Sequence, residues 1–316
     1  MNRKALKRIP LEKLMDLKVD YAFKQLFGSE QNKNITVVFL NAILAKTGRD
    51  KVKEILFVNQ EIGGRHLDDK QSRLDIVVRT QDGDLINVEM QLSNQNDMMK
   101  RTLFYWSRLF TDQLQKGKGY QTLLPTITIN ICDFTLFTDT KTYHSTYHLY
   151  EDQSLTRLPA KDDVLEIHFI EMNKFIKAWH ADELDAFEDI LVRWLLLLGM
   201  VDARKQKVYN DIYLELEELA MKDERLIEAF NAWEELSQTP DTIIAYHSRL
   251  KSIIDEEAKL DYAKHKGKEE GKEEGKKEII LTGYRNGIET STLALLTGYS
   301  VEEVEVIIGE LTSHGE

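Results

Sequence analysis

Three polar side chains in the first third of the chain have the types and spacing to hold a divalent metal ion: Asp75, Glu89 and Gln91. Hydrolysis of a phosphodiester bond needs hard oxygen ligands for Mg²⁺ or Mn²⁺, and a group that positions the attacking water. Glu89 and Gln91 are two residues apart, so on a strand both side chains point to the same face. Whether Asp75 joins them depends on the turn between the two strands.

That turn contains Gly83 and allows two registers. A two-residue loop ending at Gly83 would place Asp75 opposite Met90, on the wrong face of the sheet. A three-residue loop, residues 81–83, places Asp75 directly opposite Glu89, and its last position favours the left-handed backbone that glycine adopts readily. The register therefore favours one shared acidic site. The alternative is that both carboxylates lie on the solvated face of a half-buried sheet.

The elements that must position these residues follow from the periodicity of apolar side chains. Apolar residues at helical spacing indicate a long helix over 96–116, with its apolar side formed by Met99, Leu103, Trp106, Phe110 and Leu114. Earlier helices are predicted over 14–28 and 34–48, and strands over 54–62, 74–80, 85–93, 123–134, 143–151 and 164–172. This order predicts a mixed α/β or α+β domain around one sheet.

After about residue 173 the strand patterns stop and amphipathic helices follow. We therefore predict four parts: a core domain over 1–172, a helical domain over 173–262, a charged Gly/Lys/Glu spacer over 263–278 and a helix–turn–helix-like tail over 279–316. In the tail, Gly298 ends one helix, and Ser300 with Glu303 forms a capping box for the next. That last helix carries glutamates and no lysine or arginine, which disfavours contact with phosphates. A small protein-interaction or self-association module is the expected role of the tail, and self-association would give a homo-oligomer through the helical C-terminal region.

Charge is distributed unevenly along the chain. The net charge is −12, but residues 1–120 carry 21 Lys and Arg against 15 Asp and Glu, while the remainder carries 21 against 39. Phosphate binding requires only a local basic surface, so a DNA-facing first half is compatible with an acidic second half. The single Cys132 excludes an internal disulfide, and no apolar run is long enough to span a bilayer or to form a secretory signal. These features predict a cytoplasmic protein.

A wider pattern surrounds the acidic residues: DYAFKQLFG precedes them, LDIVV, the Asp-Gly turn and NVEMQ contain them, and GKGYQTLLPTITINICDF follows. Together these segments, most of residues 14–140, resemble the PD-(D/E)XK nuclease family transposases, also called recombination-promoting nucleases. The resemblance implies an α/β (α+β) restriction-endonuclease-like core with a mixed central sheet, followed by an all-α C-terminal region. It also implies that Asp75 and Glu89 hold Mg²⁺ or Mn²⁺ and that Asp20, from the first helix, completes the catalytic set. Because Lys18 and Lys24 are near Asp20 in the sequence, a plain surface ion pair is an equally good interpretation of Asp20.

One position departs from the wider superfamily, where the third motif residue is often lysine. Gln91 stands there, and a neutral amide can orient water but supplies no positive charge. Glutamine also occurs at this position within the resembling family, so the substitution does not imply inactivity. Arg101, Tyr105 and Lys24 are candidate DNA-binding residues, although an arginine packed on a tyrosine is equally ordinary.

Three hypotheses follow. The leading one is a metal-dependent DNA endonuclease of low sequence specificity that promotes recombination or element mobility. The second is a catalytically inactive nuclease fold used as a binding or regulatory protein. The third is autoinhibition, in which the acidic half occupies the basic half until DNA displaces it.

Overall fold

The structure, a computed structural model, describes residues 9–58, 61–62, 72–94, 97–159 and 162–312. Contacts divide the chain into two compact units, residues 1–251 and 252–316. Within the described ranges, no helix is both long and apolar enough to cross a membrane. The middle of the first predicted strand, residues 59–60, lies outside the described residues.

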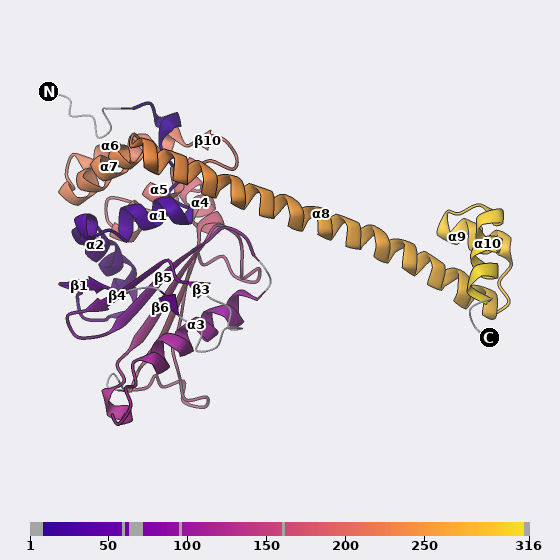
Figure 1. The fold of residues 1–316 in the computed structure, drawn as a ribbon, viewed down its shortest axis with the longest axis horizontal. Helices are drawn as coiled ribbons and strands as arrows, with labels where there is room; N and C mark the ends of the chain where they lie inside the picture. Colours follow the sequence, from indigo (N-terminus) through magenta and orange to yellow (C-terminus); the bar gives the residue numbers. More distant parts are fainter. Residues whose placement is uncertain (1–8, 59–60, 63–71, 95–96, 160–161, 313–316) are drawn as a thin grey trace. The chain divides into compact units, whose positions relative to one another are not determined.

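A six-stranded mixed sheet forms the centre of the first unit (Figure 1). Its order is β1-β4-β5-β6-β8-β7, where β4, β5, β6 and β8 are the inner strands. The strands pair antiparallel from β1 to β5, parallel from β5 through β6 to β8, and antiparallel again at β7. Their bounds are β1 Ile55–Phe57, β4 Ile76–Thr80, β5 Leu85–Gln91, β6 Thr126–Cys132, β7 His144–Tyr147 and β8 Leu165–Glu171; a separate two-stranded ladder joins β2 Glu61–Ile62 and β3 Ser72–Arg73.

Helices cover both faces of this sheet (Figure 1). On one face, α3 (Met98–Asp112) packs Tyr105 and Leu109 against Val77, while α1 (Asp20–Phe27) and α2 (Lys33–Leu44) lie on the other. The predicted apolar side of α3 is partly wrong. The buried positions are Met98, Thr102 and Leu109. Thr102 can be buried because its hydroxyl donates to the side-chain oxygen of Asn130 on β6 at 3.3 Å. Met99 and Leu103, which the pattern assigned to the core, are exposed.

The first helix begins later than its apolar spacing predicts. Residues 14–19 are buried but not helical, because the Asp16 carboxylate accepts a hydrogen bond from the backbone N–H of Lys18 at 2.9 Å and replaces the helical pattern. The same carboxylate pairs with the buried ammonium of Lys18 at 2.9 Å. The Lys18 ammonium also donates to the carbonyl of Val201 at 2.6 Å. This segment therefore links the sheet domain to the later helices.

Those later helices pack onto α1 and α2. Trp194 of α5 lies 6.1 Å, centroid to centroid, from both Phe27 and Phe39, and Trp233 of α7 donates to the carbonyl of Met15 at 2.9 Å. A short hairpin interrupts the otherwise helical region, which the pattern did not predict. The bounds are α4 Met172–His180, α5 Ile190–Gly199, β9 Val201–Asp202, β10 Lys207–Val208, α6 Asn210–Ala220, α7 Glu224–Leu236 and α8 Pro240–Arg285. The mixed sheet, its flanking helices and the C-terminal helices confirm the predicted fold class.

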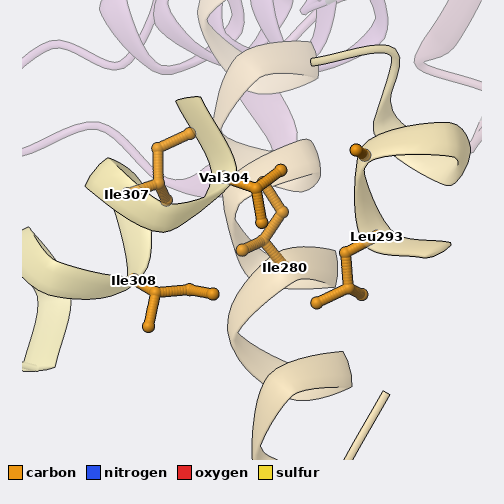
Figure 2. Close-up of a cluster of buried hydrophobic side chains, with 6 residues drawn as sticks. Ile280, Leu293, Val304, Ile307 and Ile308 are labelled. Carbon is orange, nitrogen blue, oxygen red and sulfur yellow. The ribbon is translucent and has the colours of Figure 1, made fainter. Parts of the chain in front are cut away.

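The second unit has its own small core. Ile280 of α8 packs with Leu293 of α9 (Thr290–Thr297) and with Val304, Ile307 and Ile308 of α10 (Val301–Thr312) (Figure 2). Gly298 ends α9 with a left-handed φ of 77°, and Ser300 and Glu303 form the predicted capping box through bonds of 2.7 and 3.2 Å. The Gly/Lys/Glu repeat is helical within α8.

Candidate active site on the β4–β5 hairpin

The hairpin has the register that the three-residue loop predicts. Val77 pairs with Asn87 and Ile76 with Val88, so the next step outward sets Asp75 opposite Glu89. Gly83 has a φ of 93°, and a Cβ atom there would lie 2.5 Å from the Leu124 side chain. Glycine is thus required at this turn for its backbone and for space. The turn therefore sets which side chains share the face.

The Asp75 and Glu89 carboxylates each accept a hydrogen bond from a backbone N–H of the opposite strand segment. The Glu89 carboxylate accepts from the N–H of Asp75 at 3.2 Å, and the Asp75 carboxylate accepts from the N–H of Met90 at 2.8 Å. Both residues are nearly buried, with 6% and 3% exposure respectively. Burial raises the pKa of Glu89 to about 8, and the neighbouring charge of Asp75 adds to the effect. The two carboxylates therefore resist being ionised together unless a cation joins them.

A lysine from α1 reaches this pair. The Lys24 ammonium lies 2.9 Å from the Asp75 carboxylate, with about a third of the lysine side chain exposed. Burial raises the pKa of Asp75, and the charge of Lys24 opposes that shift. The sequence pointed to Lys24 only as a DNA-binding candidate. The fold places its positive charge directly beside the acidic pair.

Asp20, one turn before Lys24 on α1, faces a different partner. Its two carboxylate oxygens accept from Arg249 Nε at 2.8 and 2.9 Å, and Arg249 belongs to α8. Asp20 is still close enough that its charge contributes to the raised pKa of Asp75. Arg249 was missed from the sequence because it lies 229 residues from Asp20 and belongs to no recognisable motif.

Gln91 and Arg101 complete the surroundings of Glu89. Gln91 Nε2 donates to the Glu89 carboxylate at 3.2 Å, and the charge of Arg101, on α3, lowers the pKa of Glu89 against the effect of burial. The Arg101 guanidinium also lies 5.5 Å from the centre of the Tyr105 ring. Tyr105 itself packs beside Val77 and Leu109, so its ring has a structural role as well.

The donor chemistry of the pair fits a hard divalent cation. Mg²⁺ is commonly bound through one or two carboxylates, with water and substrate phosphates filling the other positions. Asp75 and Glu89 supply two anionic oxygen donors whose mutual repulsion a cation would relieve. Among the described residues, no group of three or more His, Cys, Asp or Glu side chains is arranged to hold a metal ion. Asp75 and Glu89, with Gln91 beside them, are the residues that would hold Mg²⁺.

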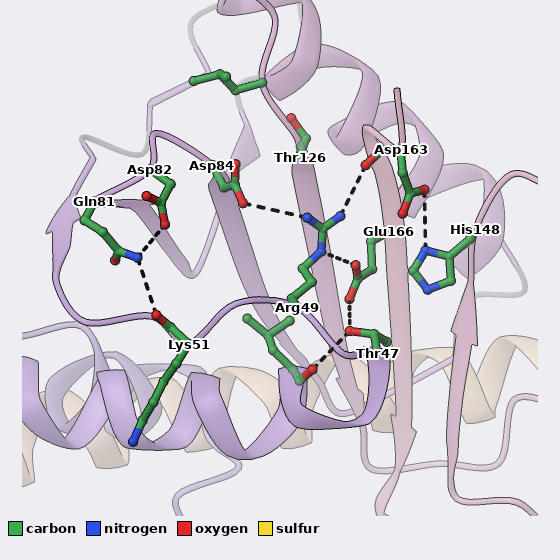
Figure 3. A network of polar contacts seen from close by, with 12 residues as sticks. Thr47, Arg49, Lys51, Gln81, Asp82, Asp84, Thr126, His148, Asp163 and Glu166 are labelled. Carbon is green, nitrogen blue, oxygen red and sulfur yellow. Dashed lines mark hydrogen bonds and ion pairs between the residues drawn. The ribbon is translucent and has the colours of Figure 1, made fainter. Parts of the chain in front are cut away.

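A second polar network lies at the opposite end of the sheet, where β5 and β8 begin (Figure 3). Arg49 pairs with the buried Glu166, which also accepts from Thr47 at 2.8 Å and from the His168 ring at 2.7 Å. The His168 ring in turn contacts the His144 ring at 2.9 Å. Burial lowers the pKa of His144 to about 2, so it stays neutral. Through the bonds of Thr47 and Arg49 to Glu166, this network fastens the α2–β1 connection to β8.

Comparison with known families gives one match. The model described as PD-(D/E)XK nuclease family transposase matches residues 17–263, which include every residue of the acidic pair and its surroundings. Among curated proteins and among solved structures, none matches the chain.

Proposed function

Since this chain belongs to the PD-(D/E)XK nuclease family transposases, we propose that it is a metal-dependent DNA endonuclease of low sequence specificity. The observation that carries the proposal is the pairing of Asp75 and Glu89, buried and directly opposed on adjacent strands. The breaks it makes would promote recombination or element mobility. A site of this kind hydrolyses phosphodiesters, and strand transfer would require further machinery.

Each residue of the site has a proposed role. Asp75 and Glu89 would hold Mg²⁺ or Mn²⁺, which when bound lowers the pKa of water and stabilises charge on the phosphate. Gln91 orients the attacking water by hydrogen bonding, and Asp20 holds a water in the outer part of the site. The attacking water loses a proton to solvent as its oxygen bonds to phosphorus, the bond to one sugar oxygen breaks, and that oxygen takes up a proton from solvent. Basic residues, including Arg101, contact the DNA backbone, which predicts little sequence preference.

Lys24 supplies the positive charge that Gln91 lacks. Its ammonium lies 2.9 Å from Asp75, whereas the usual motif lysine would come from the β5 strand at the position of Gln91. A point charge there can stabilise the attacking hydroxide or the leaving oxygen. Lys24→Met should therefore slow cutting by at least about 100-fold, and adding Gln91→Lys should restore part of it. Full activity in Lys24→Met would remove Lys24 from the mechanism.

The first experiment is nicking of supercoiled plasmid by purified protein in Mg²⁺, Mn²⁺, Ca²⁺ and EDTA. Asp75→Asn keeps the size of the side chain but removes its charge, and Asp82→Asn, in the loop of the same hairpin, serves as the matched control. We expect metal-dependent nicking that Asp75→Asn abolishes and Asp82→Asn retains. Equal nicking by both variants would refute the proposed site. DNA binding without cutting by the parent protein would favour the second function, an inactive nuclease fold that acts as a binding protein.

The second unit suits self-association more than DNA reading. Its last helix carries Glu302, Glu303 and Glu305, while Leu295 and Leu296 on α9 are exposed. Exposed apolar side chains beside acidic ones disfavour phosphate and favour a protein surface. We therefore propose that any homo-oligomer forms through this helical region.

A further inference from the structure

The exposed side of α3 carries apolar side chains that the fold leaves unburied. Phe104 is 56% exposed, Leu103 45% and Met99 37%. In the sequence, Met99 and Leu103 stand at the helical spacing of a buried face, yet the helix buries Met98, Thr102 and Leu109 instead. Large apolar side chains gathered on one exposed surface commonly mark a binding site. We call Met99, Leu103 and Phe104 the α3 apolar patch.

The charges around this patch indicate the class of molecule that would bind to it. Lys100 precedes Phe104 by one helical turn and Arg108 follows it by one turn, so both flank the ring on the helix surface. The helix α3 contains three cations, the third being Arg101, and one carboxylate, Asp112, at its last position. Such a surface suits a polyanion that also offers flat apolar groups. Nucleic acid has this combination, because phosphates alternate with bases whose faces stack on aromatic rings.

The patch is linked to the acidic pair through Arg101 and Tyr105. The charge of Arg101 acts on the Glu89 carboxylate, and its guanidinium lies 5.5 Å from the Tyr105 ring. The ring of Phe104 lies 5.6 Å from that same Tyr105 ring, at an interplanar angle of 63°. Arg101, whose charge acts on the Glu89 carboxylate, therefore lies within one helical turn of the exposed Phe104 ring. DNA held for cutting at Glu89 would pass over this turn.

We infer that Phe104 stacks on an unpaired or unstacked base of the bound DNA, so that the preferred substrate is single-stranded or locally melted DNA. This inference rests on the proposed nuclease function and adds the substrate's structure to it. In a regular duplex the bases are stacked on one another and offer no face to Phe104. Leu103 and Met99 extend the apolar surface beside the ring, while Lys100 and Arg108 contact the adjoining phosphates.

The test measures base unstacking separately from cutting. Full-length protein in EDTA is titrated into a labelled oligonucleotide with one 2-aminopurine, presented as a single strand, as a duplex with a mismatch at that base and as a perfect duplex. Anisotropy gives affinity, and 2-aminopurine fluorescence reports stacking. The variants are Phe104→Ala and Phe104→Trp, with Tyr150→Ala as control because Tyr150 has a matching exposure of 53%. Metal-dependent nicking by the parent protein is measured in parallel.

We expect Phe104→Ala to weaken binding of the single strand and the mismatched duplex at least about fivefold and to abolish the fluorescence change. Phe104→Trp and Tyr150→Ala should behave as the parent does. Unchanged binding and fluorescence in Phe104→Ala would overturn the inference. So would a shift of Phe104→Ala from dimer to monomer in sedimentation with an unaltered DNA response, which would make the patch an interface between copies. A parent protein that shows the Phe104-dependent response but no nicking would instead contradict the nuclease proposal.

Discussion

The protonation of the acidic pair yields a quantitative prediction for metal binding. Burial first, and then the charge of Asp75, raises the pKa of Glu89 to about 8, whereas a divalent cation binds the ionised carboxylate. At pH 7 the metal-free Glu89 side chain is therefore mostly protonated. Binding must therefore release a proton. The apparent Kd for Mn²⁺ should fall about tenfold per pH unit between pH 6 and 8 and level off above pH 8.

Isothermal titration calorimetry of Mn²⁺ into the full-length protein, from pH 6 to 9, measures this dependence. Repeating each titration in two buffers of different ionisation enthalpy gives the number of protons released. Glu89→Gln should lose both the affinity and the proton release, and Asp82→Asn should keep both. Tight binding whose Kd stays constant across this range, with no proton release, would refute the electrostatic reasoning.

Three further predictions test the architecture around the site. Because the pKa of Glu89 is raised in the folded state, the metal-free fold becomes less stable as pH rises from about 5 through 8. In EDTA at pH 9, Glu89→Gln should therefore raise the Tm, while the same variant should abolish cutting in the presence of metal. An equal or lower Tm would count against a destabilising charge on the buried Glu89 carboxylate. Gly83→Ala places a Cβ atom on a backbone with a left-handed φ and 2.5 Å from the Leu124 side chain. Urea unfolding should show that the free energy of unfolding falls by about 1–3 kcal/mol. Little change would mean that the loop relaxes. Asp16→Ala leaves the Lys18 ammonium buried without its partner carboxylate and should lower the free energy of unfolding by about 3–5 kcal/mol in the same assay. The double variant Asp16→Ala/Lys18→Met should recover part of this stability. An unchanged stability in Asp16→Ala would mean that other partners hold Lys18.

The hairpin of the site could be predicted from the sequence because its determinants are local. Strand register alternates with a period of two, and Gly83 selects the three-residue loop, so the opposition of Asp75 and Glu89 follows from about fifteen residues of chain. The strands of the sheet and the helices after residue 173 likewise follow from apolar periodicity, whereas the mixed character of the sheet was implied by the family resemblance. The roles assigned to the site residues remain predictions.

The parts that failed depend on contacts between distant segments. The first helix starts at Asp20 because a buried ion pair and a side-chain hydrogen bond of Asp16 replace helical bonding, and apolar spacing carries no sign of either. The pairing of Arg249 with Asp20 spans 229 residues. The buried face of α3 was misassigned because Thr102 is polar, and only the presence of Asn130 across from it makes its burial favourable.

The buried segment before α1 has a consequence for the order in which the protein is made. Its backbone N–H groups at Met15 and Asp16 bond Ser237 and the Tyr246 hydroxyl, residues that leave the ribosome more than two hundred positions later. Until Ser237 and Tyr246 have been synthesised, the segment before α1, the helix that carries Lys24, lacks these two hydrogen bonds. Contacts between residues so far apart in the sequence form late in folding. We therefore expect a nascent or prematurely ended chain to lack a competent site even when its sheet is complete. If the protein cuts DNA as proposed above, this dependence would keep unfinished copies harmless.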